Sequence, residues 1–252
     1  MQLLIEHDLP KELVLPINYQ RVIQGMIYHG MDEFPGYGDF VHSEGYMYKE
    51  RQYRLFTFSL LKGKYRIEQG KIIFREHVSF EVRSPEALLL KLLKEKWETE
   101  GIQYQKQKYD NVQAVLMDET IEWERLYIRM KTPLVGYETD KNSGKTYYYS
   151  PDEQEFYDSV YYNFLRKYCA YTGIEAIERI ELYPLRISEK DKYVTKYKDF
   201  YITAWLGEYV LSGPRKYLDF LYQTGLGSKN AQGFGMFEVV GEIEADDGED
   251  FY

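Results

Sequence analysis

Residues 225–240, GLGSKNAQGFGMFEVV, place four glycines within eleven positions, directly before an apolar run that is typical of a β-strand. Glycines spaced this closely let main-chain N–H groups approach a phosphate group or another stretch of backbone. A tight turn before a final strand is the simpler explanation of the same residues. The order of strands and helices in the rest of the chain has to distinguish these readings.

The first half of the chain alternates strand patterns with two helix patterns. Strands are predicted at 2–7, 53–61, 64–74 and 77–83, and helices at 17–28 and 84–97, with a loop at 29–40. The first strand is expected to end in the region of Pro10 and Pro16, and Gln69-Gly70 predicts a hairpin turn. Ser84 and Pro85 indicate the start of the second helix.

The second half repeats this order. A strand pattern at 120–134 is followed by a helix at 150–173, strand patterns at 176–187 and 193–211, a helix at 212–225 and a last strand at 235–243. Ser150 with Pro151 predicts the start of the long helix, and Gly173 predicts its end. A Ser-x-Pro entrance recurs at Ser212.

Both halves therefore have the order β-α-β-β-α-β, which predicts an α+β protein made of two tandem ferredoxin-like (RRM-like) domains. The expected domains are residues 1–122 and 123–241, the second carrying the glycine-rich loop, with extra strand-like pieces at 102–117 as the link. Residues 242–252 form an acidic tail that is predicted to be disordered.

The composition restricts where the protein acts. The chain has 252 residues, 44% of them hydrophobic, enough for one large or two ordinary domains. Its only cysteine, Cys169, excludes an internal disulfide and points to a reducing compartment. The N-terminal MQLLIEHDLP lacks the basic start of a signal peptide, and no apolar run approaches the roughly 18 residues of a membrane helix. We expect a cytoplasmic protein with no membrane partner.

The net charge of −9 at first opposes binding to nucleic acid. Six acidic residues and no basic residue lie in the last eleven positions, so most of the excess negative charge belongs to the tail. Local basic strips on the two domains remain compatible with this composition.

Two nucleotide-binding motifs can be excluded. The tripeptide GKT at 144–146 would need a glycine at position 139 to form a P-loop, and that residue is Thr139. The glycine-rich loop has Asn230 where the dinucleotide fingerprint requires the third glycine, and a strand rather than a helix follows it. We expect no cofactor.

The position of the glycine-rich loop, between the last helix and last strand of a duplicated β-α-β-β-α-β chain, resembles the CRISPR-associated endoribonucleases that process precursor CRISPR RNA (the Cas-six family). The pattern Gly-apolar-Gly, five residues, Gly-apolar-Gly is matched by GLG-SKNAQ-GFG, with Lys229 inside the spacer. LPINYQRVIQGMIY, YRLFTFSLL and the KTPL strand followed by SPDEQEFYDSVYYNFLRKY resemble other segments of the family. The resemblance covers nearly the whole chain.

The resemblance implies a catalytic histidine between the first helix and the second strand, and His42 is the histidine of that segment. Tyr28 and Lys49 resemble the tyrosine and lysine that accompany it in some members, with Arg51 as a substitute for Lys49. His29 competes with Tyr28 as the supporting residue. His7 and His77 belong to strand ends and are expected to be structural.

RNA cleavage chemistry requires residues of these types. The sequence shows no His, Asp and Glu cluster with recognisable metal-ligand spacing, so no metal site is predicted and the ribose 2′-hydroxyl is the expected nucleophile. The reaction then needs a base, an acid and positive charge near the phosphate, and histidine titrates near neutral pH. The products would carry a 5′-hydroxyl and a 2′,3′-cyclic phosphate.

Contacts to RNA phosphates are expected from lysine and arginine side chains and from the glycine-rich loop. The predicted residues are Lys131, Lys141, Lys145, Arg186, Lys192, Lys196 and Lys229, together with Gly225, Gly227, Gly233 and Gly235. The sequence leaves open whether the loop contacts the RNA backbone or packs the two domains together.

The sequence thus predicts a metal-independent endoribonuclease that binds and cuts the repeat of precursor CRISPR RNA, acting as a monomer or homodimer or with subunits of a CRISPR effector complex. A non-catalytic CRISPR RNA-binding subunit of such a complex is one alternative. A ferredoxin-like protein-interaction module, which the acidic charge would suit, is another.

Overall fold

The computed structural model describes residues 1–32, 34, 36–197 and 200–243, apart from the side chain of His42. The predicted acidic tail therefore lies outside the described residues, except for its first two positions. No helix in the described part of the chain is both long and apolar enough to cross a membrane.

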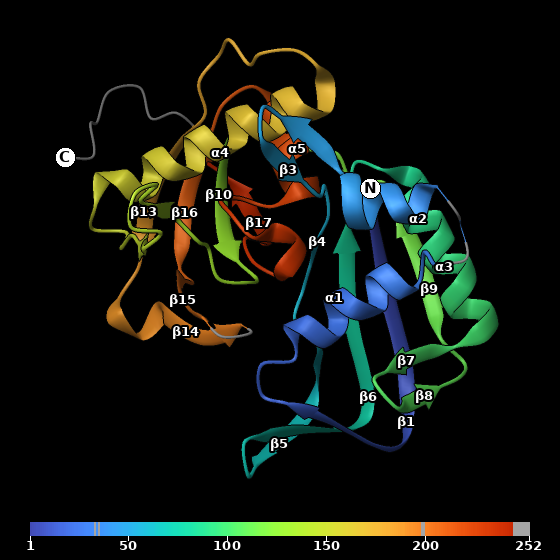
Figure 1. Cartoon of the computed structure of the whole chain (residues 1–252). Helices are drawn as coiled ribbons and strands as arrows, with labels where there is room; N and C mark the ends of the chain where they lie inside the picture. Colours follow the sequence, from blue (N-terminus) through green and yellow to red (C-terminus); the bar gives the residue numbers. More distant parts are fainter. Residues whose placement is uncertain (33, 35, 198–199, 244–252) are drawn as a thin grey trace.

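The first half forms an antiparallel sheet in the order β4-β6-β1-β9, with β5 also paired to β6 (Figure 1). Its strands are β1 Gln2–Pro16, β4 Thr57–Phe58, β5 Lys62–Glu68, β6 Lys71–Arg83 and β9 Gln113–Met117. The helices α1 Gln20–His29 and α3 Ala87–Glu100 pack on it, and Ile23, Ile27 and Leu93 of these helices share one buried core with Leu3, Phe74 and Phe80 of the strands.

The second half forms an antiparallel sheet in the order β13-β16-β10-β17. Its strands are β10 Arg125–Met130, β13 Glu181–Arg186, β16 Glu208–Ser212 and β17 Phe237–Glu242. The helices α4 Gln154–Thr172 and α5 Arg215–Thr224 bury residues such as Phe164 and Leu218 against it. Both sheets have the order of a ferredoxin-like domain, second strand, third, first and fourth, so the predicted fold class is confirmed.

Short elements decorate the two domains. In the first these are α2 Tyr37–Asp39, the π-helical turn η1 Phe40–Glu44 and the hairpins β2 Tyr46–Tyr48 with β3 Arg51–Tyr53 and β7 Ile102–Tyr104 with β8 Gln107–Tyr109. In the second they are β11 Tyr137–Thr139, β12 Thr146–Tyr148, η2 Glu189–Asp191, β14 Lys192–Tyr197, β15 Phe200–Trp205 and η3 Asn230–Gln232. The predicted loop at 29–40 therefore contains helical turns. The predicted link at 102–117 includes β9, an edge strand of the first sheet.

Several strand boundaries differ from the prediction. β1 continues through Pro10 to Pro16, because the register against β6 shifts between Leu9 and Leu13, and a bulge accommodates a proline that donates no ladder hydrogen bond. The part of the predicted segment 64–74 that follows the Gln69-Gly70 turn and the strand predicted at 77–83 form one strand, β6. Of the strand predicted at 53–61, Tyr53 and Thr57–Phe58 pair with neighbouring strands, and the main-chain N–H of Ser59 donates to the carbonyl oxygen of Glu81 in β6 at 2.9 Å. The hairpin turn at Gln69-Gly70 is confirmed.

The helices start two or more residues later than the serines indicate. Glu86, Glu153 and Pro214 stand at the N-cap positions of α3, α4 and α5. The Ser84 hydroxyl instead accepts the main-chain N–H of Glu86 at 3.0 Å, so it satisfies the turn before the helix. The predicted end of α4 at Gly173 is confirmed, with the glycine in the left-handed conformation at φ 72°.

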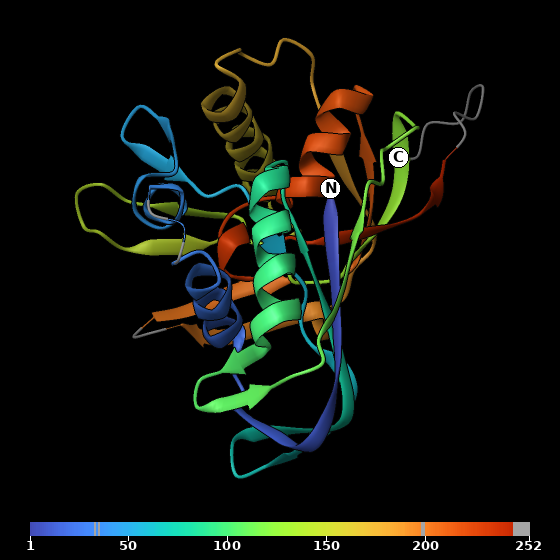
Figure 2. The ribbon, with the colours of Figure 1, turned by 90° about the vertical axis from the view of Figure 1, so that its right-hand side faces the viewer.

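The two domains are joined by polar contacts at their interface. The guanidinium of Arg83, at the end of β6, donates to the carbonyl oxygen of Phe237 at 2.6 Å and lies 3.8 Å from the centre of the Tyr222 ring. Lys131 forms an ion pair with Glu81 at 2.6 Å. Because β9 ends at Met117 and β10 begins at Arg125, we propose that the domains meet within residues 118–124, a segment that includes the predicted boundary at 122. Figure 1 shows the two units side by side, and in the perpendicular view of Figure 2 the first domain lies in front of the second.

Candidate functional site

A large groove of about 1830 Å³ opens between the two domains. Its walls come from α1, the β2–β3 hairpin, the β11–β12 hairpin, α4 and residues 228–232 of the glycine-rich loop. Segments from both halves of the sequence are therefore needed to form it.

The groove has a local excess of positive charge in an acidic protein. Eight lysine and arginine residues line it: Arg21, Lys49, Arg51, Arg54, Lys141, Arg166, Lys167 and Lys229. Five acidic residues accompany them: Glu50, Glu138, Asp140, Glu155 and Asp158. This excess suits a polyanion better than the chain's net charge of −9 would indicate.

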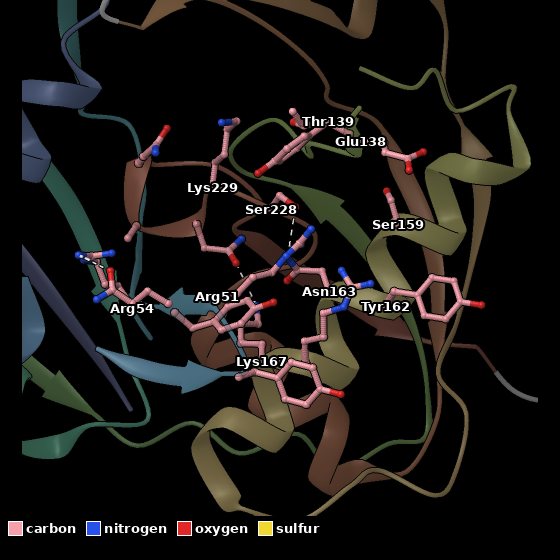
Figure 3. A pocket seen from close by; sticks show the side chains of 18 of the residues that line it. Arg51, Arg54, Glu138, Thr139, Ser159, Tyr162, Asn163, Lys167, Ser228 and Lys229 are labelled. Carbon is pink, nitrogen blue, oxygen red and sulfur yellow. Dashed lines mark hydrogen bonds between the residues drawn. The ribbon is translucent and has the colours of Figure 1, made fainter. Parts of the chain in front are cut away.

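One face of α4 meets the glycine-rich loop at the base of the groove. The side-chain amide of Asn163 donates to the Ser228 hydroxyl at 3.2 Å, and Lys167, one turn further along α4, is buried beside the loop. Figure 3 shows Asn163 bonded to Ser228, with Lys167 on the same helix and Arg51 and Arg54 on the side of the β2–β3 hairpin. Polar donors from three separate segments thus converge on one space.

His42 lies in the π-helical turn η1, and its side chain is outside the described part of the structure. The neighbouring residue, Ser43, accepts a hydrogen bond through its carbonyl oxygen from the side chain of Gln52 at 2.7 Å. Gln52 belongs to β3 and lines the groove. The main chain next to His42 is therefore attached to a groove-lining hairpin.

Tyr28, near the end of α1, lines the groove. Its half-buried ring packs edge-on against Phe56 at a centroid distance of 5.7 Å. Burial raises the pKa of the Tyr28 phenol above its ordinary value of 10.0, so the group is a hydroxyl at neutral pH. A phenol that ionises so reluctantly is better suited to orienting a substrate by a hydrogen bond than to transferring a proton.

Lys49 occupies the turn of the β2–β3 hairpin and lines the groove. Its main chain has φ 52°, unusual for a residue with a Cβ atom, and its ammonium lies 5.4 Å from the centre of the Tyr48 ring. Arg51, the predicted substitute, starts β3 in the same hairpin and also lines the groove. His29 points elsewhere: it is exposed and bonded to Asp32 at 2.7 Å.

The predicted phosphate contacts are spread over the second domain. Lys141 and Lys229 line the groove, and the ammonium of Lys229 lies 4.8 Å from the centre of the Tyr137 ring. Lys131 is instead ion-paired with Glu81 at the domain interface, beside a second cavity of about 560 Å³. The remaining predicted residues are Lys145 near β12, Arg186 on β13, and Lys192 and Lys196 on β14.

The four loop glycines allow close packing of the protein against itself. At Gly235 (φ 76°), an added Cβ atom would lie 2.0 Å from the carbonyl oxygen of Leu226, and at Gly233 it would meet the ring of Phe58 in the first domain at 2.7 Å. An added Cβ atom would also be too close to Asn230 at Gly225 and to the carbonyl oxygen of Val135 at Gly227. The loop therefore packs between the domains, which supports one of the two alternatives; contact with RNA stays a prediction.

Sequence reasoning missed several groove residues: Arg21, Arg54, Ser159, Asn163, Arg166, Lys167 and Ser228. A helical pattern was available for some of them. Ser159, Asn163 and Arg166 follow the i, i+4, i+7 spacing of one helix face, as do Arg21, Gly25 and Tyr28 on α1. The direction of those faces depends on how the two domains dock.

Two tandem ferredoxin-like domains, with a groove between them that has an excess of basic residues, define a duplicated ferredoxin-like scaffold. Residues 116–239 match the family model described as CRISPR associated protein Cas6, C-terminal. The matched C-terminal half of the chain belongs to the Cas6 family of CRISPR-associated proteins. No match was found among curated proteins.

Solved structures share the complete fold. A structure described as "An RAMP protein binding different RNA substrates" has a TM-score of 0.78 and 18% identity, covering 96% of this chain and 100% of that chain. A Cas6-related protein from Pyrococcus furiosus has a TM-score of 0.76 and 19% identity, covering 96% and 99%. A structure described as "CRISPR associated protein Cas6" has a TM-score of 0.73 and 18% identity, with the same coverage of 96% and 99%.

Proposed function

We propose that this protein is an endoribonuclease that binds the repeat of precursor CRISPR RNA in the groove between its domains and cuts it. The observation that carries the proposal is the groove itself, because it combines a positive charge excess with Tyr28, Lys49 and the hairpin attached to the His42 turn. Membership of the C-terminal half in the Cas6 family and the fold shared with a structure described as binding RNA substrates support the choice of RNA.

In the proposed reaction the ribose 2′-hydroxyl attacks the adjacent phosphorus, and the bond from phosphorus to the 5′-oxygen breaks. His42 transfers protons, and Tyr28 orients the 2′-hydroxyl or a phosphate oxygen through its phenol. Lys49 or Arg51 offsets the negative charge that develops on the phosphate oxygens. The products are a 2′,3′-cyclic phosphate and a 5′-hydroxyl, and no metal ion takes part in any of these steps.

The test is cleavage of repeat RNA in excess EDTA by the unsubstituted protein, His42→Ala and His29→Ala. We expect the unsubstituted protein and His29→Ala to cut, and His42→Ala to be slower by a factor on the order of 10² to 10⁴. His29→Ala is the matched control, because it removes an exposed histidine bonded to Asp32.

The ends of the products test the chemistry. A 5′-hydroxyl end accepts phosphate from polynucleotide kinase without prior phosphatase treatment, and a cyclic phosphate opens in acid. Binding of repeat RNA without cleavage would favour a non-catalytic CRISPR RNA-binding subunit instead. Loss of cleavage on metal removal would contradict the proposed mechanism.

A further inference from the structure

The amine of Lys167 is buried in the second domain, with 2% of the residue exposed. Three oxygen atoms surround its Nζ atom: the carbonyl of Gly225 at 2.6 Å, the side-chain oxygen of Asn230 at 3.0 Å and the carbonyl of Thr224 at 3.4 Å. An ammonium has three N–H donors, so these acceptors match the protonated form, whereas a neutral amine could satisfy only two.

These acceptors connect Lys167 to the whole glycine-rich loop. Gly225 begins the loop directly after α5, and Asn230 lies at its centre in η3. The side-chain amide of Asn230 in turn donates to the carbonyl oxygens of Leu226 at 2.8 Å and Phe234 at 3.1 Å. One lysine and one asparagine therefore join the beginning, middle and end of the loop to α4.

The contacts between α4 and the glycine-rich loop also involve the loop residues that face the groove. Asn163, one turn before Lys167, donates to Ser228, and the next loop residue, Lys229, has a left-handed main chain at φ 63° and lies over the Tyr137 ring. Ser228 and Lys229 both line the groove. Their orientation depends on the part of the loop that Lys167 holds.

The three acceptors are all neutral, so the charge of Lys167 has no anionic partner among them. Burial lowers the pKa of Lys167 to about 7. The elements packed round it carry the charged residues Arg166 on α4, Lys229 in the loop and Asp219 on α5, and Asp219 accepts hydrogen bonds from Gln223 and Ile121. A phosphate bound beside Lys229 would favour the charged, three-donor form.

We propose that Lys167 is a positioning residue of the RNA site: its buried amine holds the glycine-rich loop in the shape that presents Ser228 and Lys229 to the bound strand. The inference rests on the proposed function only in taking RNA as the groove's ligand. Lys167 acts through the loop and does not touch the reacting atoms.

The test measures binding of repeat RNA in EDTA, with all variants built in the His42→Ala background so that the RNA stays intact. We expect Lys167→Met, which keeps the length of the side chain, to bind about tenfold more weakly at pH below 7. Lys190→Met, which removes an exposed lysine within η2, is the matched control and should bind like its parent.

Three readouts separate positioning from a loss of fold. Amide hydrogen exchange in residues 225–235 should accelerate in Lys167→Met and not in Lys190→Met. The effects of Lys167→Met and Lys229→Met should be non-additive, since the first acts through the second. Binding by the parent should weaken as pH rises through about 7, and Lys167→Met should lose that component.

Additive effects in the double variant, or unchanged RNA affinity in a folded Lys167→Met protein, would refute the positioning role. Cleavage that persists in the His42→Ala background would refute the catalytic assignment alone, because affinities can still be compared on the uncut RNA. If the parent bound no repeat RNA at low salt, the proposed function would fail and this inference with it.

Discussion

Burial of Lys167 makes the stability of the fold depend on pH. Its pKa is about 7 in the folded protein, against an ordinary value of 10.5. Between these values the unfolded chain binds more protons than the folded protein, so the free energy of unfolding rises with pH by up to about 1.4 kcal/mol per pH unit. The lowered pKa of His7 changes the pH dependence of the free energy of unfolding only below about pH 6.5. The raised tyrosine pKa values change it only above about pH 10.

Urea unfolding between about pH 7.5 and about pH 9.5 checks this prediction. We expect the unsubstituted protein to gain stability over this window and Lys167→Met to gain much less. The difference between the two proteins isolates Lys167 from Lys131 and Lys229, whose pKa values burial also lowers. Parallel pH profiles of the two proteins would show that folding does not lower the pKa of Lys167.

Individual side chains of the site were predictable only in part. Tyr28 and Lys49, which the family resemblance singled out, line the groove together with Lys141 and Lys229, and their roles stay predictions. Lys131 carries the same charge but is drawn into an ion pair with Glu81, 50 positions away in the other domain. Sequence alone does not distinguish a lysine that is exposed to solvent from one that forms an ion pair with a residue of a distant segment.

The glycine-rich loop is the element whose shape tolerates substitution least. At Gly235 an added methyl group would overlap the carbonyl oxygen of Leu226, and φ is 76°. We expect Gly235→Ala to destabilise the protein by about 2 kcal/mol or more, because main chain rather than a mobile side chain has to move. Thermal or urea unfolding measures the effect.

Gly241→Ala provides the comparison. Gly241 lies in β17 with nothing within 4 Å of an added Cβ atom, so we expect this variant to unfold like the unsubstituted protein. Equal stabilities of the two variants would mean that the loop can relax, and that its close packing is not required for the fold.

Elements were predicted best where one local signal acts alone. The Gln69-Gly70 turn and the Gly173 helix end depend on residues next to them, and both were predicted correctly. The continuation of β1 through Pro10 depends on pairing with β6, which begins 55 residues after β1 ends. Such long-range pairing outweighs the local preference of proline, so the strand pattern alone ended too early.

The charge of the groove predicts how RNA binding responds to salt. Each RNA phosphate neutralised by a basic side chain contributes about −0.7 to the slope of log affinity against log salt concentration. We therefore expect a negative slope, reduced in size by about 0.7 in Arg51→Ala. Titrations at several salt concentrations, with His42→Ala as the parent, give these slopes.

Arg66→Ala is the control for this measurement. Arg66 lies on β5 and is paired with Glu12 and Glu68, and it does not line the groove. Its removal should leave the slope unchanged. A slope that changes equally in both variants would indicate diffuse attraction by the whole protein rather than binding in the groove.

The strand order of both sheets was predicted from the sequence, but the way in which the two domains pack against each other was not. The repeated β-α-β-β-α-β order identified both sheets, because each is built from patterns within one half of the chain. The groove was not predictable in the same way, since its shape depends on pairs such as Gln24 with Ala231, joined across the domains at 2.7 Å. Those contacts have no local signature in either half.

The contacts of Arg83 determine when this interface can form during synthesis of the chain. Its guanidinium, 2% exposed, finds carbonyl acceptors on Tyr222 and Phe237, which the ribosome adds about 140 and about 150 residues later. While the chain is being made, the nascent N-terminal domain thus exposes the ion pair of Arg83 with Glu81 and the surface around it. Interface assembly has to wait until the C-terminal strand has left the exit tunnel.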